Sequence, residues 1–339
     1  LNRASDYGSE GYRFESCMSH KKHSRQRVCF FVGMSDIKKI QDGQALSRRE
    51  QLMLAVKLAM PAILAQLSSI MMQYIDASMV GRLGTDPSAS VGLMSSSLWL
   101  FWGICSMVAM GFSVQVAHCL GAKEFAKARS VLRQGLVSVV VFSMLMALLG
   151  VAIAPGLPHW LGGKAEITAD ATLYFTVFVS ALPMLTLNYI CGGMLRSAGQ
   201  MKIPSILNVL MCVLDVVFNF FLIFPARQLD IAGMQFIVPG AGLGVLGAAL
   251  GTVLAEVIVA LLMCRYLCWR QEELNIARYA RESFRPTKAV LKKALRISLP
   301  MTLEHAIFCG AQIMITIIVA PLGAVAIAAN AFAVTAESL

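Results

Sequence analysis

Residues 58–84 read LAMPAILAQLSSIMMQYIDASMVGRLG, and this stretch decides the class of fold. Leu, Ile, Met, Ala and Val dominate it, with small residues between them and few polar side chains. A helix of such length, at about 1.5 Å per residue, is long enough to cross the roughly 30 Å of hydrocarbon in a bilayer. We therefore expect a membrane-spanning helix that carries one carboxylate, Asp76, near its end.

Apolar segments of similar length follow along the rest of the chain. The expected spans are 53–80, 89–118, 134–154, 168–194, 203–225, 242–268, 297–320 and a last one that opens near Gly323. The chain is 57% hydrophobic and 14% charged, with a mean hydropathy of +0.68, whereas soluble domains are about half apolar and a quarter charged. This composition predicts an all-α polytopic membrane protein. It excludes a soluble enzyme, a nucleic-acid-binding domain and a secreted disulfide scaffold.

Lys and Arg residues gather in alternate connections between the spans. If the N-terminus is cytosolic, the inside connections hold fifteen of them, whereas the outside connections hold only Arg82, Lys164 and Arg227. Cytosolic connections of membrane proteins carry such an excess of positive charge. We therefore expect a bacterial plasma (inner) membrane protein with a cytosolic N-terminus. The net charge of +10 then reflects topology and contact with membrane lipids, with no nucleic acid as partner.

An internal repeat divides the chain. Shifting the sequence by 239 positions aligns residues 58–84 with residues 297–323, so that Pro61 meets Pro300 and both stretches end in Leu-Gly. Two spans that enter the membrane from the same side indicate a parallel repeat about an axis along the membrane normal. The expected organisation is a polar, disordered tail over 1–50, a six-helix N-lobe over 51–268, a cytosolic linker over 269–296 and the start of a second lobe over 297–339. The linker reads as an amphipathic interfacial helix broken at Pro286.

The sequence holds no catalytic or cofactor motif. No nucleophile motif, phosphate-binding loop or cluster of metal ligands is found, and the nine cysteines are scattered without a CxxC pair. We therefore expect no enzyme activity, no cofactor and no ATP-driven pumping by this chain.

Four carboxylates are expected at bilayer depth: Asp76, Asp215, Glu256 and Glu304. A charged side chain at bilayer depth is costly unless it is paired or hydrated, so each one is a candidate functional residue. Asp215 and Asn219 are four residues apart and share a helix face. With Asp76 and Thr252 they fall in the outer half of three different spans. This set predicts a site for a monovalent cation or for a proton, and the residues themselves leave both readings open.

Glu256 lies deeper than the other candidates. It is predicted to face a central cavity, where it would attract a cationic substrate, to snorkel toward the membrane surface, or to pair with a polar neighbour. Glu304 and His305 lie near a cytosolic end and are predicted to be interfacial.

Several motifs together resemble the multidrug and toxic compound extrusion (MATE) transporters. They are the first span with YIDASMVGRLG, LGAKEFAKARSVLRQG after the second span, MLRSAGQMKIP before the fifth, VLDVVFNFFLIFP within it, GAALGTVLAE in the sixth and ISLP…APLGAVAIAANAFA in the seventh and eighth. The resemblance covers roughly residues 50–339. It implies two six-helix lobes around a central cavity and export of amphipathic, often cationic compounds driven by H⁺ or Na⁺. It also implies that this chain is a truncated member, and we expect a monomer.

The resemblance assigns a role to each residue of the predicted cation site. The family's first-helix Asp corresponds to Asp76 and its sixth-helix Thr to Thr252. Its fifth-helix Asn and Asp, four residues apart, correspond to Asp215 and Asn219 with the two residue types exchanged. The exchange keeps the polar atoms on one helix face but moves the charge by one turn. The alternative function is a flippase for lipid-linked oligosaccharides in the same wider superfamily.

Overall fold

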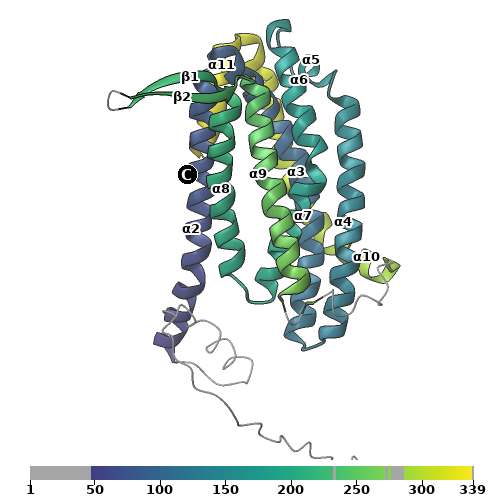
Figure 1. The fold of residues 1–339 in the computed structure, drawn as a ribbon. Coiled ribbons are helices and arrows are strands. Elements are labelled where there is room, and N and C mark those ends of the chain that lie inside the picture. The colour runs from purple at the N-terminus through teal and green to yellow at the C-terminus, as the bar shows by residue number, and fades with distance from the viewer. Residues whose placement is uncertain (1–46, 232–233, 272–273, 276–285, 338–339) are drawn as a thin grey trace, which may run out of the picture. The chain divides into compact units, whose positions relative to one another are not determined.

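The structure is a computed structural model that describes residues 47–231, 234–271, 274–275 and 286–337. Its long helices run side by side, as Figure 1 shows. In chain order the elements are α2 (Arg48–Gly81), α3 (Thr85–Gly121), α4 (Phe125–Ile153), α5 (Leu157–Trp160), α6 (Ala165–Ser180), α7 (Leu182–Ser197), α8 (Lys202–Ile223), β1 (Pro225–Ile231), β2 (Met234–Ala241), α9 (Gly244–Trp269), α10 (Lys288–Val319), η2 (Ala320–Leu322) and α11 (Ala324–Glu337). Of the tail expected over 1–50, residues 1–46 lie outside the described part.

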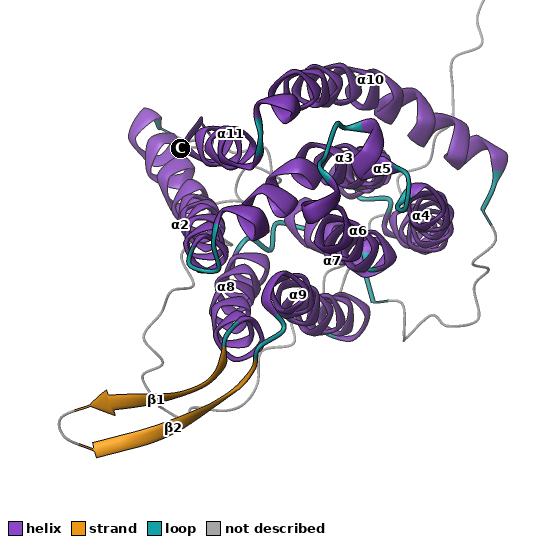
Figure 2. Cartoon of the chain, turned by 90° about the horizontal axis from the view of Figure 1, so that it is seen from above, coloured by secondary structure: helices purple, strands orange, loops and turns teal. Residues whose placement is uncertain are grey.

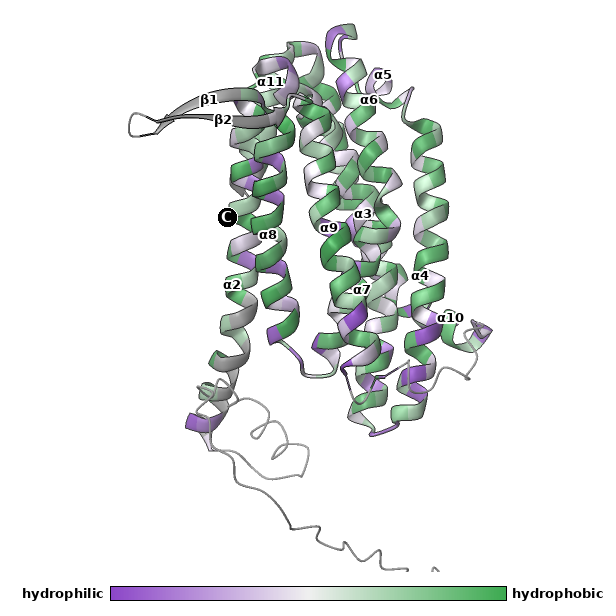
Figure 3. Cartoon of the chain, in the orientation of Figure 1, coloured by the Kyte–Doolittle hydropathy of each residue, from purple (hydrophilic) through white to green (hydrophobic). Residues whose placement is uncertain are grey.

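The expectation of a helical protein with several membrane spans is confirmed. Five described helices, α3, α4, α8, α9 and α10 with η2, are long and apolar enough to cross a membrane, and the pair α6–α7 qualifies as a sixth span. Figure 3 shows that hydrophobic residues cover most of their length. The first expected span lies in α2, which is 34 residues long but is not among the helices counted as spans.

The fourth expected span is not one straight helix. It consists of α6 and α7, which meet at Ala181 with a bend of 45°. Pro183 occupies the first turn of α7, where its missing N–H removes a backbone hydrogen bond and its ring clashes with a continuing helix. The bend therefore has a cause in the sequence.

A β-hairpin, which the sequence analysis did not predict, follows the fifth span. Strand β1 pairs antiparallel with β2, and the hairpin projects from the C-terminal end of α8 and the N-terminal end of α9 (Figure 2). The hairpin leaves the helical class of the spans unchanged, because it lies wholly in the connection between α8 and α9.

Helix α3 lies among the other helices and packs against α4, α6, α7, α10 and α11. Glycines make close contact possible along its length: a side chain at Gly92 would collide with Ala331 of α11, one at Gly103 with the His305 ring, and one at Gly111 with the Ala294 carbonyl oxygen at 2.6 Å. Small residues allow helices in lipid to approach closely, and close approach gains van der Waals contact. The glycines of α3 thus allow both α10 and α11 to pack closely against it.

Helix α10 begins earlier than the expected seventh span. It starts at Lys288 rather than near residue 297, so the end of the expected linker belongs to this helix. Its first turn is held by Gln134 of α4, whose Oε1 accepts hydrogen bonds from the backbone N–H of Thr287 at 2.8 Å and from its hydroxyl at 3.0 Å. The predicted interfacial helix falls largely on residues 272–273 and 276–285, outside the described residues.

The two glycines that the 239-residue shift aligns have the same backbone conformation. Gly84, before α3, has φ 125° and ψ −176°, and Gly323, before α11, has φ 105° and ψ 176°. Only glycine adopts these angles readily. The connection that follows the first helix therefore has the same backbone conformation in both copies of the expected repeat.

Candidate functional site

The structure brings together the four residues predicted to bind a cation. Asp76 comes from α2, Asp215 and Asn219 from α8, and Thr252 from α9. The two α8 residues are four positions apart and therefore face the same neighbours. Near them, Val80 of α2 packs against Ile223 of α8 and Ala248 of α9. This apolar contact fixes the three helices at the level of the polar cluster.

The Asn219 side chain joins the two carboxylates. Its Nδ2 atom donates a hydrogen bond of 2.8 Å to Asp76 Oδ1 and one of 3.2 Å to Asp215 Oδ2. One amide group thus holds two acidic side chains from different helices. Two carboxylates so close together repel each other when both are ionised, and a bound cation or a shared proton relieves that repulsion.

Burial raises the free-energy cost of leaving the polar atoms of this cluster without partners. Asp215 and Asn219 are 0% exposed to solvent. Asp215 Oδ1 and Asn219 Oδ1 have no hydrogen-bond partner among the described residues. A buried oxygen without a partner is costly, and carboxylate and amide oxygens are the ligands that hard cations prefer. The donor set therefore fits a monovalent cation, and a proton on a carboxylate would also satisfy one of these oxygens.

Gly251 gives Asn219 the space that it occupies. A β-carbon on this α9 residue would collide with Asn219 Oδ1. One turn earlier, a β-carbon on Gly247 would lie 2.5 Å from the Leu222 carbonyl oxygen of α8. The two glycines let α9 approach α8 closely, and this explains the small residues at the start of the sixth span.

Thr252 completes the cluster from the α9 side. Its hydroxyl donates to the Ala248 carbonyl oxygen at 3.2 Å, within its own helix, and its side chain adjoins the Asp215 carboxylate. The Thr252 Oγ1 lone pairs remain available as acceptors, so Thr252 can add an oxygen ligand to the cluster.

Tyr174 is a neighbour of the cluster that the sequence analysis missed. It lies on α6, interacts electrostatically with both Asp76 and Asp215, and its ring packs against Phe178 at 4.9 Å between ring centroids. An uncharged aromatic residue in an apolar span gives no signal in the sequence. Its phenol hydroxyl is the only polar feature that a search for polar groups at the depth of the four predicted residues would have found.

Glu256 has a partner of its own. Asn188 Nδ2 of α7 donates a hydrogen bond of 2.7 Å to Glu256 Oε2, which corresponds to the paired reading of this carboxylate. Asn188 was also missed, because, like Tyr174, it is uncharged and lies in the fourth expected span, in which the sequence analysis named no site residue. Asp215 interacts electrostatically with Glu256, so the acidic residues of α8 and α9 belong to one polar region.

Glu304 and His305 lie away from this cluster. Glu304 is exposed, whereas His305 Nε2 lies 3.1 Å from the Trp99 carbonyl oxygen and 3.3 Å from Cys309 Sγ. The histidine thus lies at the contact between α10 and α3, and Glu304 takes no part in the cation cluster.

Comparison with known proteins identifies relatives of this chain. Residues 61–221 match the family model described as MatE. The probable multidrug resistance protein NorM of Thermotoga maritima is 24% identical over 291 residues, which cover 84% of this chain and 58% of the relative. The multidrug export protein MepA of Staphylococcus saprophyticus is 23% identical over 273 residues, covering 80% of this chain and 56% of the relative. The chain thus spans rather more than half the length of these two relatives.

Solved structures share the fold. An inward-facing multidrug resistance MATE family transporter of the MOP superfamily is 21% identical with a TM-score of 0.60, covering 78% of this chain and 56% of that one. A MOP superfamily transporter from Pyrococcus furiosus Vc1, described as having a binding pocket of reversed polarity that suggests a different function, is 20% identical with a TM-score of 0.63, covering 84% of this chain and 64% of that one. At these identities the likeness concerns the fold.

Proposed function

The chain belongs to the MATE family of membrane transporters, and from this premise we propose that it is the cation-binding part of a secondary active multidrug exporter. In this proposal, inward movement of H⁺ or Na⁺ drives the export of amphipathic, often cationic compounds across a bacterial plasma (inner) membrane. The N-terminus is cytosolic and the protein is a monomer. Multidrug export is the activity for which the NorM and MepA relatives are named.

One observation carries the proposal. Asp76 and Asp215 share the Asn219 amide, and an oxygen of Asp215 and one of Asn219 stay without a partner in a buried position. A purely structural polar network would satisfy these atoms, because buried polar groups in proteins are nearly always hydrogen-bonded. A site that binds and releases a cation must instead leave oxygens available.

The cluster also supports a route from cation binding to movement. Asp76 is the proposed ligand that α2 supplies, whereas the other ligands belong to α8 and α9, so a cation bound among them changes how strongly α2 is held. A ligand shifts a conformational equilibrium only by its difference in affinity for the two states. A cation that binds best when α2 lies against α8 would therefore favour that state, and its release would free α2 to move.

The test measures cation binding by the purified 339-residue chain in detergent. The melting temperature is followed when Na⁺ replaces choline at constant ionic strength, and separately when the pH is lowered from mildly alkaline to mildly acidic without Na⁺. Ligand that binds only the folded state raises the melting temperature. We expect either Na⁺ or the lowered pH to raise the melting temperature, and the condition that does so identifies the coupling ion.

Matched variants locate the effect. Asp76→Asn and Asp215→Asn should abolish the cation-dependent rise, whereas Asp170→Asn, which changes an exposed carboxylate of α6, should retain it. If Asp215→Asn responds as the parent does, Asp215 is a packing residue and the cation site is wrong.

The flippase of lipid-linked oligosaccharides remains the alternative function. Ethidium export driven by an imposed H⁺ or Na⁺ gradient in vesicles separates the two functions, because a flippase would leave ethidium distribution unchanged. The polar groups of the cluster are acidic and neutral, which favours a cation over the anionic diphosphate of such a lipid.

A further inference from the structure

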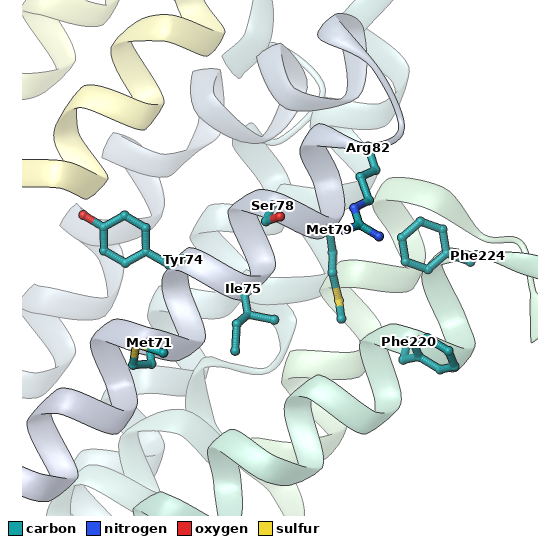
Figure 4. Close-up of a pocket in the computed structure, with 8 residues that line it drawn as sticks. All are labelled: Met71, Tyr74, Ile75, Ser78, Met79, Arg82, Phe220 and Phe224. Carbon is teal, nitrogen blue, oxygen red and sulfur yellow. The ribbon is translucent and has the colours of Figure 1, made fainter. Parts of the chain in front are cut away.

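An open groove lies between α2 and α8. It encloses about 400 Å³, within the range of ligand-binding clefts. Its lining residues are Met71, Tyr74, Ile75, Ser78, Met79 and Arg82 of α2 with Phe220 and Phe224 of α8 (Figure 4). All but Ser78 and Arg82 present apolar or aromatic surface.

The groove lies beside the flank of α2 that α11 covers. Successive residues of a helix are about 100° apart, so Gly81 points about 140° to one side of Asp76 and Arg82 about 120° to the other side. Phe332 of α11 lies 3.5 Å from the place of a β-carbon on Gly81. Helix α11 therefore covers the Gly81 side of α2, and the groove extends round α2 from beside this side to Arg82, about 100° away from Gly81. There Met71 of α2 and Phe221 of α8 are exposed.

The length of the groove matches one leaflet of a bilayer. From Met71 to Arg82, α2 rises by about 16 Å, and half of the hydrocarbon core is about 15 Å. Met71, Ile75 and Met79 are spaced by four residues and form one apolar strip along this rise. Methionine side chains adapt to irregular apolar partners, which suits a flexible acyl chain.

Arg82 supplies the charge at the outer end of the groove. It is exposed, and no ion pair to it is found among the residues that the structure describes, although Asp86 lies four positions on. In Figure 4 its guanidinium group extends toward Phe224. A guanidinium group binds phosphate oxygens through two parallel hydrogen bonds. Arg82 is also one of three positive residues in the outside connections, where Lys and Arg are otherwise scarce.

We propose that this groove binds one anionic phospholipid of the outer leaflet. The acyl chain lies along Met71, Ile75 and Met79, and the phosphate of the head group pairs with Arg82. Such a lipid would brace α2 against α8 one face away from Asp76. The proposal concerns binding alone and does not depend on transport.

The experiment uses the whole chain in phosphatidylcholine vesicles. A small fraction of phosphatidylglycerol or, separately, of phosphatidylcholine carries a photoreactive diazirine on its acyl chain. After illumination, mass spectrometry compares labelling of the 71–82 segment with labelling of Val141, Leu145 and Leu148, which are exposed on α4 and report random lipid contact. We expect the ratio to be about fivefold higher for phosphatidylglycerol, the factor typical of one basic residue near an anionic lipid.

Two variants test the head group and the chain separately. Arg82→Gln should reduce the phosphatidylglycerol ratio to the phosphatidylcholine value, whereas Lys164→Gln, which removes another outer positive charge, should leave it high. Ser78→Phe fills the groove and should lower labelling by both lipids without changing labelling of α4. Equal ratios for the two lipids in the parent, or a preference that persists in Arg82→Gln, would overturn the proposal.

Discussion

Asn219 and Asp76 are 143 positions apart in the chain, yet the amide of one donates a hydrogen bond of 2.8 Å to the carboxylate of the other. This bond joins α8 to α2. The second hydrogen bond of the same amide reaches Asp215. Asp and Asn stand in the opposite order on α8 from the family pattern, yet the Asn219 amide still donates to both the Asp76 and the Asp215 carboxylates.

The first prediction tests this exchange. Asp215→Asn removes a carboxylate, and Asn219→Asp alone places three carboxylates together without the amide that bridges them. Both single variants should lose the cation-dependent rise in melting temperature. The double variant Asp215→Asn with Asn219→Asp restores the set of two carboxylates and one amide, with both exchanged residues on the same face of α8. The effects of substitutions within one hydrogen-bond network do not simply add. The double variant should therefore regain at least about half of the rise in melting temperature. A double variant as unresponsive as Asp215→Asn would contradict this account.

The second prediction concerns the bridging amide itself. Asn219→Leu leaves Asp76 and Asp215 without their shared donor in a buried position. Loss of hydrogen bonds to charged groups should lower the free energy of unfolding by about 2–3 kcal/mol. Chemical denaturation of the chain in mixed micelles measures the change. Asn275→Leu serves as the control, because this side chain donates a solvent-exposed hydrogen bond of 3.1 Å to the Trp269 carbonyl oxygen, and it should have a smaller effect.

Much of this site was predictable from sequence because charge in an apolar span is conspicuous. Asp76, Asp215, Asn219 and Thr252 were found from their type, spacing and depth along straight helices. Tyr174 and Asn188 were missed because they are uncharged.

The spans themselves were predictable from their length and apolar composition, but three features were not. The break at Ala181 depends on whether Pro183 ends a helix or bends it, and the hairpin stretch reads as a loop because it contains Pro and Gly. The seating of α10 on α3 depends on contacts between residues about 200 positions apart, which no local pattern encodes.

The third prediction tests the close contact of α9 with Asn219. Gly251→Ala puts a β-carbon where Asn219 Oδ1 lies, so the amide must move and the helices must separate. Overpacking of this kind costs about 1–3 kcal/mol, and the cation-dependent rise in melting temperature should shrink with it. Gly310→Ala is the matched control, since a β-carbon there meets no atom within 4 Å. It should be neutral or stabilising by about 0.5–1 kcal/mol, because alanine favours a helix over glycine.

The fourth prediction tests how α10 is seated on α3. A β-carbon at Gly103 would overlap the His305 ring, so Gly103→Ala should lower the melting temperature. His305→Ala removes the obstacle, and the pair of changes together should cost less than the sum of the two single changes. The melting temperatures of the parent, both single variants and the double variant give this coupling. If the two costs simply add, Gly103 and His305 do not meet as the structure places them.

The last prediction concerns orientation, which rests on the distribution of Lys and Arg. In a variant without native cysteines, single cysteines replace Lys127, Lys202 or Lys164, all of which are exposed. Lys127 follows the α3–α4 connection and Lys202 the α7–α8 connection, whereas Lys164 precedes α6 at the other end of the spans. Because cytosolic connections carry the positive excess, a membrane-impermeant maleimide added to intact cells should label position 164 alone, and the other two should react only after the membrane is opened. Labelling of position 127 or 202 from outside would reverse the topology, and with it the assignment of the Arg82 groove to the outer leaflet.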